Sequence, residues 1–186
     1  SAGRIDANAF AREMEACGGP VIAIAQAGQI NTGAFDPFAR IVEAARGRNA
    51  WVHVDGAFGL WARACPDTVA LTEGLDGCDS WAVEGHKWLQ TPYDCGYAIV
   101  RDADAHRRAM TAAASYLPVG GANERDPSHL TPELSRRARG FATWAIIRHL
   151  GRQGIADMVA RHCRCARLMA ERLARESGVE IVNDVE

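Results

Sequence analysis

Long apolar runs and a strong excess of charge of either sign are both missing from this 186-residue sequence. The longest apolar run, near VIAIAQA at residues 21–27, is far shorter than the roughly 20 residues of a membrane span. A formal net charge of -2 with widely spread arginines gives no reason to expect a nucleic-acid partner. The first residues, SAGRIDANAF, lack the apolar segment of a signal peptide. We therefore expect a cytoplasmic protein that binds neither a membrane nor nucleic acid.

Paired, regularly spaced cysteines are also absent, because no CxxC motif occurs. The six cysteines are Cys17, Cys65, Cys78, Cys95, Cys163 and Cys165. The last two are separated by one residue, but no second pair of ligands follows them. Zinc sites and disulfide frameworks normally show such pairs. We expect reduced thiols and no metal site.

Short apolar runs alternate with helix-like segments along most of the chain. Strands are expected at residues 21–27, 50–57, 80–85 and 96–102, with a further one at 179–184. Helices are expected at residues 6–17, 37–46, 67–75, 133–150 and 155–176, the second capped by Asp36. This alternation predicts an α/β fold with a mostly parallel sheet and flanking helices. The fourth strand follows the third so closely that we expect the two to be antiparallel.

The order of elements changes after about residue 113, where a stretch rich in proline and glycine begins. Residues 116–132 are expected to form a mobile loop, because a long loop in a compact domain is usually functional or mobile. A Gly-containing break follows at residues 151–154, ahead of an arginine-rich helix. We therefore expect residues 1–150 to belong to one large domain and residues 151–186 to begin a second.

Several polar residues follow the carboxyl ends of the expected strands. Asn31 and Thr32 follow the first strand, Asp55 ends the second, and Lys87 follows the third. Open α/β sheets bind ligands outside the carboxyl ends of their strands, so these side chains are expected to face one crevice. Asp55 also shares a strand face with His53. Each residue has an ordinary alternative, such as a turn former, a solvated lysine or a core histidine, so the pattern alone predicts only an acid–lysine crevice.

Four longer motifs carry a family resemblance. NTGAFDP, WVHVDGAFGLWA, DSWAVEGHKWLQTPYDCG and ELSRRARGFATWA resemble the pyridoxal-phosphate-dependent group II amino acid decarboxylases, among them the aromatic amino acid, glutamate, histidine and cysteine sulfinate enzymes. The resemblance implies a pyridoxal phosphate (PLP) fold type I large domain, similar to aspartate aminotransferase, and the start of a small C-terminal domain. It also implies decarboxylation of an L-amino acid, which is a carbon–carbon lyase reaction, in a homodimer.

The resemblance assigns the two central roles to Lys87 and Asp55. Lys87 resembles the lysine that holds the cofactor as an internal aldimine, since an amine forms an imine with an aldehyde. Asp55 resembles the carboxylate that pairs with the pyridine nitrogen of the cofactor. A protonated ring nitrogen lets the ring accept the electrons that remain when carbon dioxide leaves.

Five further residues receive supporting roles from the resemblance. Ala57 resembles the small residue that packs against one face of the cofactor ring. His86 and Ser80 resemble residues that contact the phosphate, and Thr32 resembles one that lies near the ring. Tyr116, at the start of the proline-rich stretch, resembles a loop tyrosine that protonates the substrate carbon.

The sequence leaves the reaction and the substrate partly open. Another fold type I activity, such as an aminotransferase, a carbon–sulfur lyase or an aldehyde-forming relative, uses similar motifs, and a catalytically incomplete fragment is a third reading. The phosphate-binding loop and the ring-stacking residue of the family have no counterpart before residue 28, and the chain does not begin with methionine. We expect an internal segment of a longer enzyme, acting on an aromatic or otherwise bulky amino acid.

Overall fold

A computed structural model describes residues 3–111 and 126–185 of the chain, which forms two compact units. One unit consists of Ser1–Ile99 with Arg139–Glu186, and the other of Val100–Ala138. Tyr116 and most of the expected 116–132 loop lie outside the described residues. All other residues that the sequence analysis singled out for chemistry belong to the first unit.

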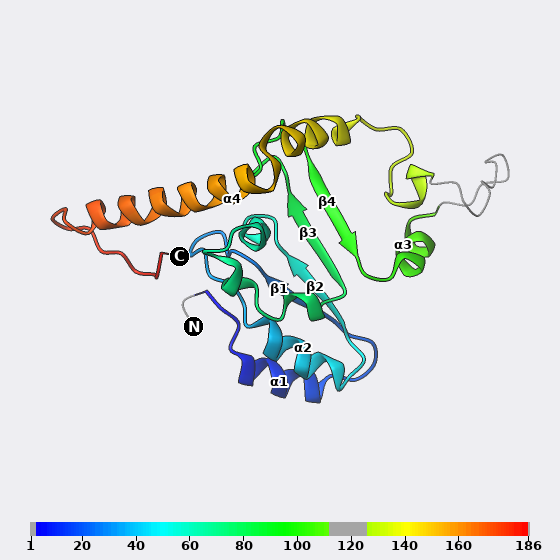
Figure 1. The fold of residues 1–186 in the computed structure, drawn as a ribbon. Helices are drawn as coiled ribbons and strands as arrows, with labels where there is room; N and C mark the ends of the chain where they lie inside the picture. Colours follow the sequence, from blue (N-terminus) through cyan, green and yellow to red (C-terminus); the bar gives the residue numbers. More distant parts are fainter. Residues whose placement is uncertain (1–2, 112–125, 186) are drawn as a thin grey trace. The chain divides into compact units, whose positions relative to one another are not determined.

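A four-stranded sheet forms the centre of the first unit. The strands are β1 (Ile22–Gln26), β2 (Trp51–Asp55), β3 (Ser80–Glu84) and β4 (Gly96–Val100), and they neighbour one another in that order. β1, β2 and β3 are parallel, whereas β4 runs back beside β3 in the opposite direction (Figure 1). The predicted α/β fold with a mostly parallel sheet is confirmed.

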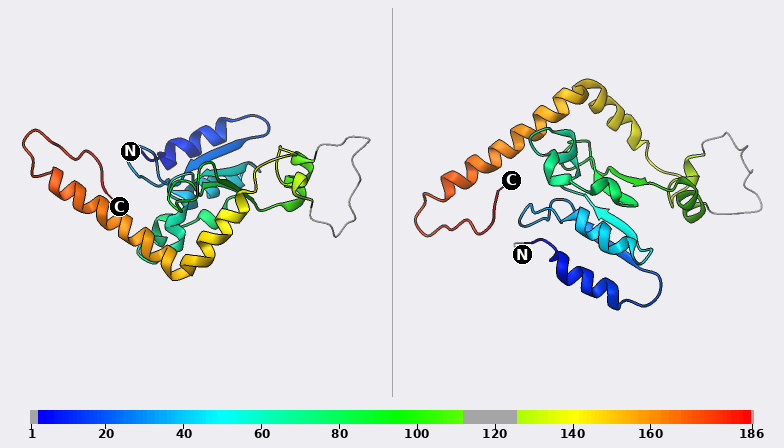
Figure 2. Two further views of the ribbon diagram at one scale, coloured as in Figure 1. Left: turned by 90° about the horizontal axis from the view of Figure 1, so that it is seen from above. Right: turned by 60° about the horizontal axis from the view of Figure 1, so that its bottom comes forward.

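Helices α1 (Ala7–Ala16) and α2 (Phe38–Arg46) lie side by side and cover one face of the sheet (Figures 1 and 2). α2 buries an apolar stripe with the spacing of a single helix face. Its members are Phe38, Ile41, Val42 and Ala45. The stripe packs against the inward residues of β1 and β2, which include the fully buried Ala25 and Val54. This core fixes the strands whose carboxyl ends carry the expected site.

The opposite face of the sheet is open in the described part of the chain. β1 alternates between buried and exposed residues, and Ile22 and Ile24 are 71% and 60% exposed. In the parallel register Ile24 pairs with His53 and Gln26 pairs with Asp55, so all four side chains point to this open face. The expected site residues of β2 therefore lie on the side away from α1 and α2.

The predicted cap of α2 is wrong. Pro37 occupies the N-cap position and no side chain caps this helix. Asp36 is instead buried, and its carboxylate accepts hydrogen bonds from the backbone N–H groups of Ile5 and Gln26, both at 2.7 Å. Two charge-assisted bonds to backbone donors explain why this carboxylate can be buried.

The segment between β2 and β3 also differs from the prediction. It forms three 3₁₀-helices, η1 (Leu60–Ala64), η2 (Val69–Thr72) and η3 (Leu75–Gly77), instead of one helix at 67–75. Gly74 interrupts the helical path with φ of 82°, and a side chain there would collide with the backbone of Ala39 in α2. The segment between β2 and β3 thus packs closely against α2 and does not form a regular helix.

The rest of the chain is largely helical. α3 (Ala103–Met110), which the sequence analysis missed, and the 3₁₀-helix η4 (Pro127–His129) belong to the second unit. α4 (Arg139–Leu173) starts six residues later than predicted and bends at Gly151, where a break was expected. Residues 179–184 form no strand. None of the described helices combines the length and the apolar character needed to cross a membrane.

Candidate active site

Lys87 follows the carboxyl end of β3 and is the single lysine among the 21 lysine and arginine residues of the sequence. Arginine stays protonated in proteins, so only lysine can supply a neutral side-chain amine as a nucleophile. The Lys87 side chain is 24% exposed, which is low for a residue type that is mostly solvated. The chain therefore places its only nucleophilic side-chain amine in a partly buried position at the sheet edge.

The ammonium group of Lys87 has two close neighbours. Its Nζ lies 2.9 Å from Oε2 of Glu84 and 3.6 Å from the ring centre of Phe58. The same Glu84 oxygen lies 2.7 Å from Nε2 of His86. The sequence analysis did not single out Glu84, although a carboxylate three residues before the lysine was the available signal.

Asp55 and Lys87 line one cavity on the open face of the sheet. The sheet-face cavity has a volume of about 810 Å³ and lies among Gln26, His53, Asp55, Ala57, Glu84 and Lys87. Such a volume is within the range of about 300–1,000 Å³ that is usual for small-molecule sites. Oδ1 of Asp55 accepts a hydrogen bond from the backbone N–H of Ala57 at 3.1 Å. This is the arrangement that the strand-end rule predicts for the two residues.

Ser80 pairs with His53 in the parallel register and lies two residues before Ala82, the partner of Asp55. Its Oγ lies 2.8 Å from Nδ1 of His53 and accepts a hydrogen bond of 2.8 Å from the indole N–H of Trp51. Ser80 is buried and does not line the sheet-face cavity. The structure thus brings Ser80 to His53 instead of to Lys87.

His86 uses both ring nitrogens within the chain. Nε2 faces Glu84, while Nδ1 accepts a hydrogen bond of 2.9 Å from the backbone N–H of Cys95. The ring also stacks on Tyr93, with 3.9 Å between ring centres. Nδ1 also lies 2.8 Å from the carbonyl oxygen of Cys95. Both ring nitrogens thus have partners, so a hydrogen bond from Nε2 of His86 to a phosphate requires that Glu84 gives up its contact.

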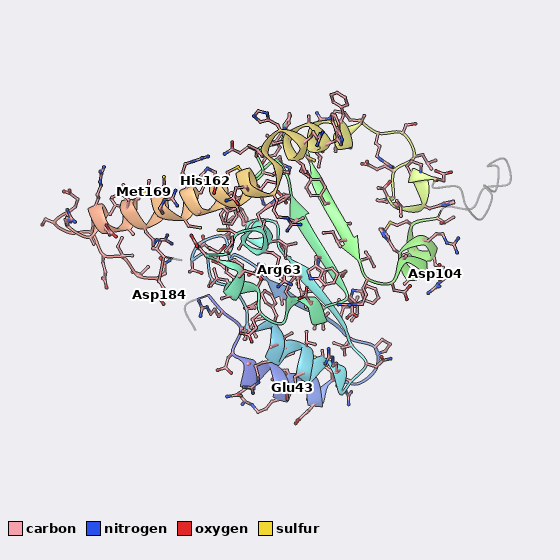
Figure 3. All side chains as sticks on the ribbon, viewed as in Figure 1. Glu43, Arg63, Asp104, His162, Met169 and Asp184 are labelled. Carbon is pink, nitrogen blue, oxygen red and sulfur yellow. The ribbon has the colours of Figure 1, made fainter. Side chains whose placement is uncertain are left out.

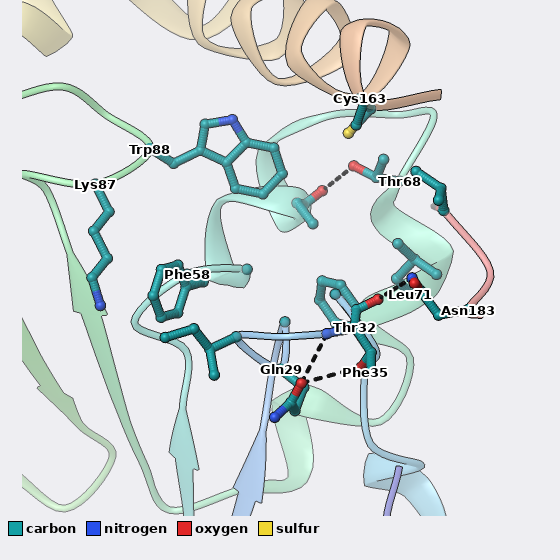
Figure 4. A pocket seen from close by; sticks show the side chains of 17 residues that line it. Gln29, Thr32, Phe35, Phe58, Thr68, Leu71, Lys87, Trp88, Cys163 and Asn183 are labelled. Carbon is teal, nitrogen blue, oxygen red and sulfur yellow. Dashed lines mark hydrogen bonds between the residues drawn. The ribbon is translucent and has the colours of Figure 1, made fainter. Parts of the chain in front are cut away.

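Lys87 also lines a second cavity, which is drawn in Figure 4. This loop-side cavity has a volume of about 500 Å³, and Thr32 and Trp88 are among its lining residues. The carboxamide oxygen of Gln29 accepts hydrogen bonds from the backbone N–H (2.9 Å) and the hydroxyl (3.2 Å) of Thr32. Lys87 and Phe58 line both cavities, but Thr32 does not share a cavity with Asp55.

Residues of β4 and α4 lie against the turn that carries Lys87. The hydroxyl groups of Tyr97 and Thr143 lie 2.8 Å apart, and Gly85 has no side chain that would collide with Tyr97. Burial raises the pKa of Tyr97 above its usual value, with a further contribution from its hydrogen bond with Cys95. Tyr97 therefore acts as a neutral hydrogen-bonding group at neutral pH.

His162 of α4 (Figure 3) connects this helix to the residue after Lys87. Its Nδ1 accepts a hydrogen bond of 2.9 Å from the indole N–H of Trp88. Burial, with a smaller effect of Arg161, lowers the pKa of His162 below its usual value. Only an imidazole without a proton on Nδ1 can accept this bond.

Acidification should weaken this contact. Because the pKa of His162 is lower in the folded chain, the unfolded chain takes up the proton first as the pH falls. The stabilisation is therefore complete above about pH 6.5 and is lost as the pH drops through the folded pKa. We expect the urea midpoint to fall more between pH 7.5 and pH 5.5 for the wild type than for His162→Gln, whose amide oxygen accepts the same bond. Equal falls would contradict this role.

Metal ligands do not gather at either cavity. Within residues 3–111 and 126–185, no three or more histidine, cysteine, aspartate or glutamate side chains are grouped so that they could hold a metal ion. The site is instead defined by one amine and two carboxylates, Asp55 and Glu84.

Nearly the whole chain matches one protein family. Residues 6–186 match the family described as the pyridoxal-dependent decarboxylase conserved domain. The chain belongs to the pyridoxal-dependent decarboxylase family. The expected resemblance is thereby confirmed.

Named relatives of this decarboxylase-family chain are considerably longer. It is 30% identical over 175 residues to 4-hydroxyphenylacetaldehyde synthase of Rhodiola rosea, covering 94% of this chain and 36% of the relative. It is also 30% identical over 169 residues to aromatic-L-amino-acid decarboxylase of Drosophila lebanonensis, covering 89% and 41%. The structure superimposes on Oryza sativa TDC with PLP and tryptamine with a TM-score of 0.90 at 24% identity, covering 98% of this chain and 39% of the other. The chain thus spans about two fifths of these proteins, and the last comparison concerns the fold alone.

Proposed function

We propose that this decarboxylase-family chain carries part of the active site of an enzyme that removes the α-carboxylate of an L-amino acid with PLP as cofactor. The observation that carries the proposal is that Asp55 and the single lysine, Lys87, line one cavity at the carboxyl ends of parallel strands. An amine and a carboxylate around one cavity match the two ends of a pyridoxal ring. Membership of the pyridoxal-dependent decarboxylase family supports the same chemistry.

The sheet-face cavity fits a flat aromatic cofactor in both size and chemistry. Asp55 is half-buried, and in the described part of the chain its carboxylate has no cationic partner. Ala57 lines the cavity beside it with a single methyl group, which leaves room for a ring face. Asp55 can therefore hold a proton at a ring nitrogen, because a carboxylate favours the charged form of a basic neighbour.

PLP, when bound, supplies an aldehyde for covalent attachment and an electron-accepting ring. In the proposed site Lys87 would hold the aldehyde through Nζ, and Asp55 would keep the ring nitrogen protonated. We assign His86 to the phosphate once Glu84 releases it, and Thr32 to the wall of the loop-side cavity. Ser80 would keep His53 oriented through their 2.8 Å contact. Tyr116 is assigned as the proton donor to the substrate carbon.

The substrate that we propose is an aromatic or otherwise bulky L-amino acid. The loop-side cavity next to Lys87 is lined mainly by apolar side chains, among them Phe35, Phe58 and Trp88. A charged substrate side chain would lose hydration beside these apolar groups. The names of the related decarboxylase and synthase point to aromatic substrates in those proteins.

The decisive experiment uses the full-length protein and a panel of L-amino acids. Release of carbon dioxide together with an amine supports decarboxylation, whereas formation of a keto acid without carbon dioxide indicates an aminotransferase. Borohydride reduction followed by peptide mapping should place the cofactor on Lys87. Absence of cofactor uptake by the full-length protein would refute the proposal and favour a catalytically incomplete relative.

An aldehyde-forming reaction is the second candidate, because one of the relatives is a synthase of an aldehyde. We expect Tyr116→Phe to keep cofactor absorbance while amine formation falls by about 100-fold, the usual worth of a positioned proton donor. Part of the product should change to aldehyde and ammonia. Quantifying both products by chromatography checks this, and an unchanged rate of amine formation would show that Tyr116 has no such role.

We further propose a cytoplasmic homodimer in which residues 1–150 belong to the large domain and residues 151–186 begin the small one. The open sheet face beside the cavity is consistent with an active site that needs additional protein for completion. Light scattering of the full-length protein tests the dimer.

A further inference from the structure

Glu84 makes a contact with Lys87 that the proposed cofactor chemistry does not explain. One carboxylate oxygen lies within hydrogen-bond distance of both Nζ of Lys87 and Nε2 of His86, at 2.9 Å and 2.7 Å. We propose that Glu84 holds Lys87 as an ammonium ion, so that loss of this contact makes the amine available as a nucleophile. This proposal rests on the proposed function only in taking Lys87 as the nucleophile.

Partial burial makes the attraction between Glu84 and Lys87 stronger than that of an ordinary surface ion pair. The side chains of Lys87 and Glu84 are 24% and 30% exposed, and that of His86 is 11% exposed. Solvent screens such a pair less than one that is fully exposed. Nε2 of His86 lies 2.7 Å from the same oxygen, which helps to fix the carboxylate in place.

Phe58 acts in the same direction. Its ring centre lies 3.6 Å from Nζ, where an ammonium ion is attracted to the face of an aromatic ring. A neutral amine gains much less from that face. Phe58 and Glu84 therefore both favour the form of Lys87 that cannot attack an aldehyde.

The other titratable groups around the sheet-face cavity are Asp55, His53 and Tyr97. Asp55 carries the same charge as Glu84, but its carboxylate is bonded to the backbone of Ala57. His53 is engaged with Ser80, and Tyr97 with Thr143. Glu84 is the carboxylate of this cavity in direct contact with Nζ, which makes it the group that holds the ammonium ion.

Deprotonation makes Lys87 reactive. Nζ of Lys87 gives one proton to water, and the lone pair on Nζ becomes free to form a bond. A lysine must be unprotonated to act as a nucleophile. Neutralising Glu84 should therefore leave a larger fraction of Lys87 in the reactive form at a given pH.

Acylation of the amine measures that fraction without the cofactor. Full-length protein stripped of cofactor with hydroxylamine is treated with limiting acetic anhydride at pH 7.5 and then digested with trypsin. Acetylated Lys87 blocks cleavage, so a peptide spanning residues 64–101 replaces two shorter ones. We expect Lys87 in Glu84→Gln to react about five-fold faster than in the wild type, which corresponds to about 1 kcal/mol.

Three variants make the test specific. Glu84→Asp keeps the charge and should react within about two-fold of the wild type. Glu43→Gln removes an exposed carboxylate on α2 that is paired with Arg40, and should leave Lys87 unchanged. Phe58→Leu removes the aromatic face and should raise the rate by about two-fold, which keeps the test valid if Glu84→Gln does not fold.

Unchanged acylation of Lys87 in both Glu84→Gln and Phe58→Leu would overturn the proposal. The proposed function fails by a different observation, namely a wild-type protein that takes up no PLP. A response of Lys87 to Glu84 in such a protein would leave the stored ammonium ion intact as a property of the chain.

Discussion

Replacing Lys87 with alanine should abolish the visible absorbance of bound cofactor and lower the rate of decarboxylation at least about 10⁴-fold. The chain has no other lysine that could replace it. Without Nζ, a pyridoxal ring loses its covalent anchor beside Asp55, and Glu84 loses its cationic partner. Absorbance spectroscopy and assays of carbon dioxide release on the full-length protein measure the two effects.

Lys87→Arg is the matched control for this experiment. A guanidinium group keeps a positive charge that can face Glu84 and Phe58, yet it cannot bond to an aldehyde. We expect Lys87→Arg to fold as well as the wild type and to lack the absorbance as completely as Lys87→Ala. Residual absorbance at wild-type strength in either variant would show that another residue holds the cofactor.

Replacing Asp55 with asparagine should have the second largest effect. The amide retains the shape and a hydrogen bond to Ala57, so we expect the protein to keep part of its cofactor. It carries no negative charge to hold a proton on the ring nitrogen, so kcat should fall by roughly 100- to 1,000-fold, or roughly 3–4 kcal/mol in the barrier. Steady-state kinetics with saturating cofactor separates this effect from weaker binding.

Asp36→Asn provides the comparison for Asp55→Asn. Asp36 is more deeply buried, but its carboxylate bonds to backbone donors of Ile5 and Gln26 and lines neither site cavity. We expect Asp36→Asn to lower the unfolding free energy by about 1–3 kcal/mol while kcat stays near that of the wild type. Equal losses of kcat in both variants would mean that Asp55 acts through the fold.

The sequence predicted the sheet and the two ends of the site because both depend on local patterns. Apolar runs between turn signals predicted four of the strands, and Asp55 and Lys87 were placed together by their positions after parallel strands. Gly151 marked the bend in α4 correctly. These features need only the neighbouring residues and the general geometry of α/β sheets.

The missed features depend on contacts between segments that are distant in the sequence. Asp36 was predicted to cap a helix, but its carboxylate accepts hydrogen bonds from backbone N–H groups 10 and 31 residues away. The contact of Ser80 with His53, 27 residues away, was likewise not predicted. Glu84 was not singled out, because its contacts with Lys87 and His86 depend on how the turn after β3 folds.

The open face of the sheet has a consequence for selectivity. Ile24 and Gln26 of β1 line the cavity that holds Asp55 and Lys87, and they are exposed on its outer side. Parallel sheets of this kind are normally covered on both faces. We expect a protein surface that lies over β1 to form the outer wall of this cavity as well. Two homologues with identical residues here could thus prefer different amino acids, because the discriminating contacts would come from the covering surface.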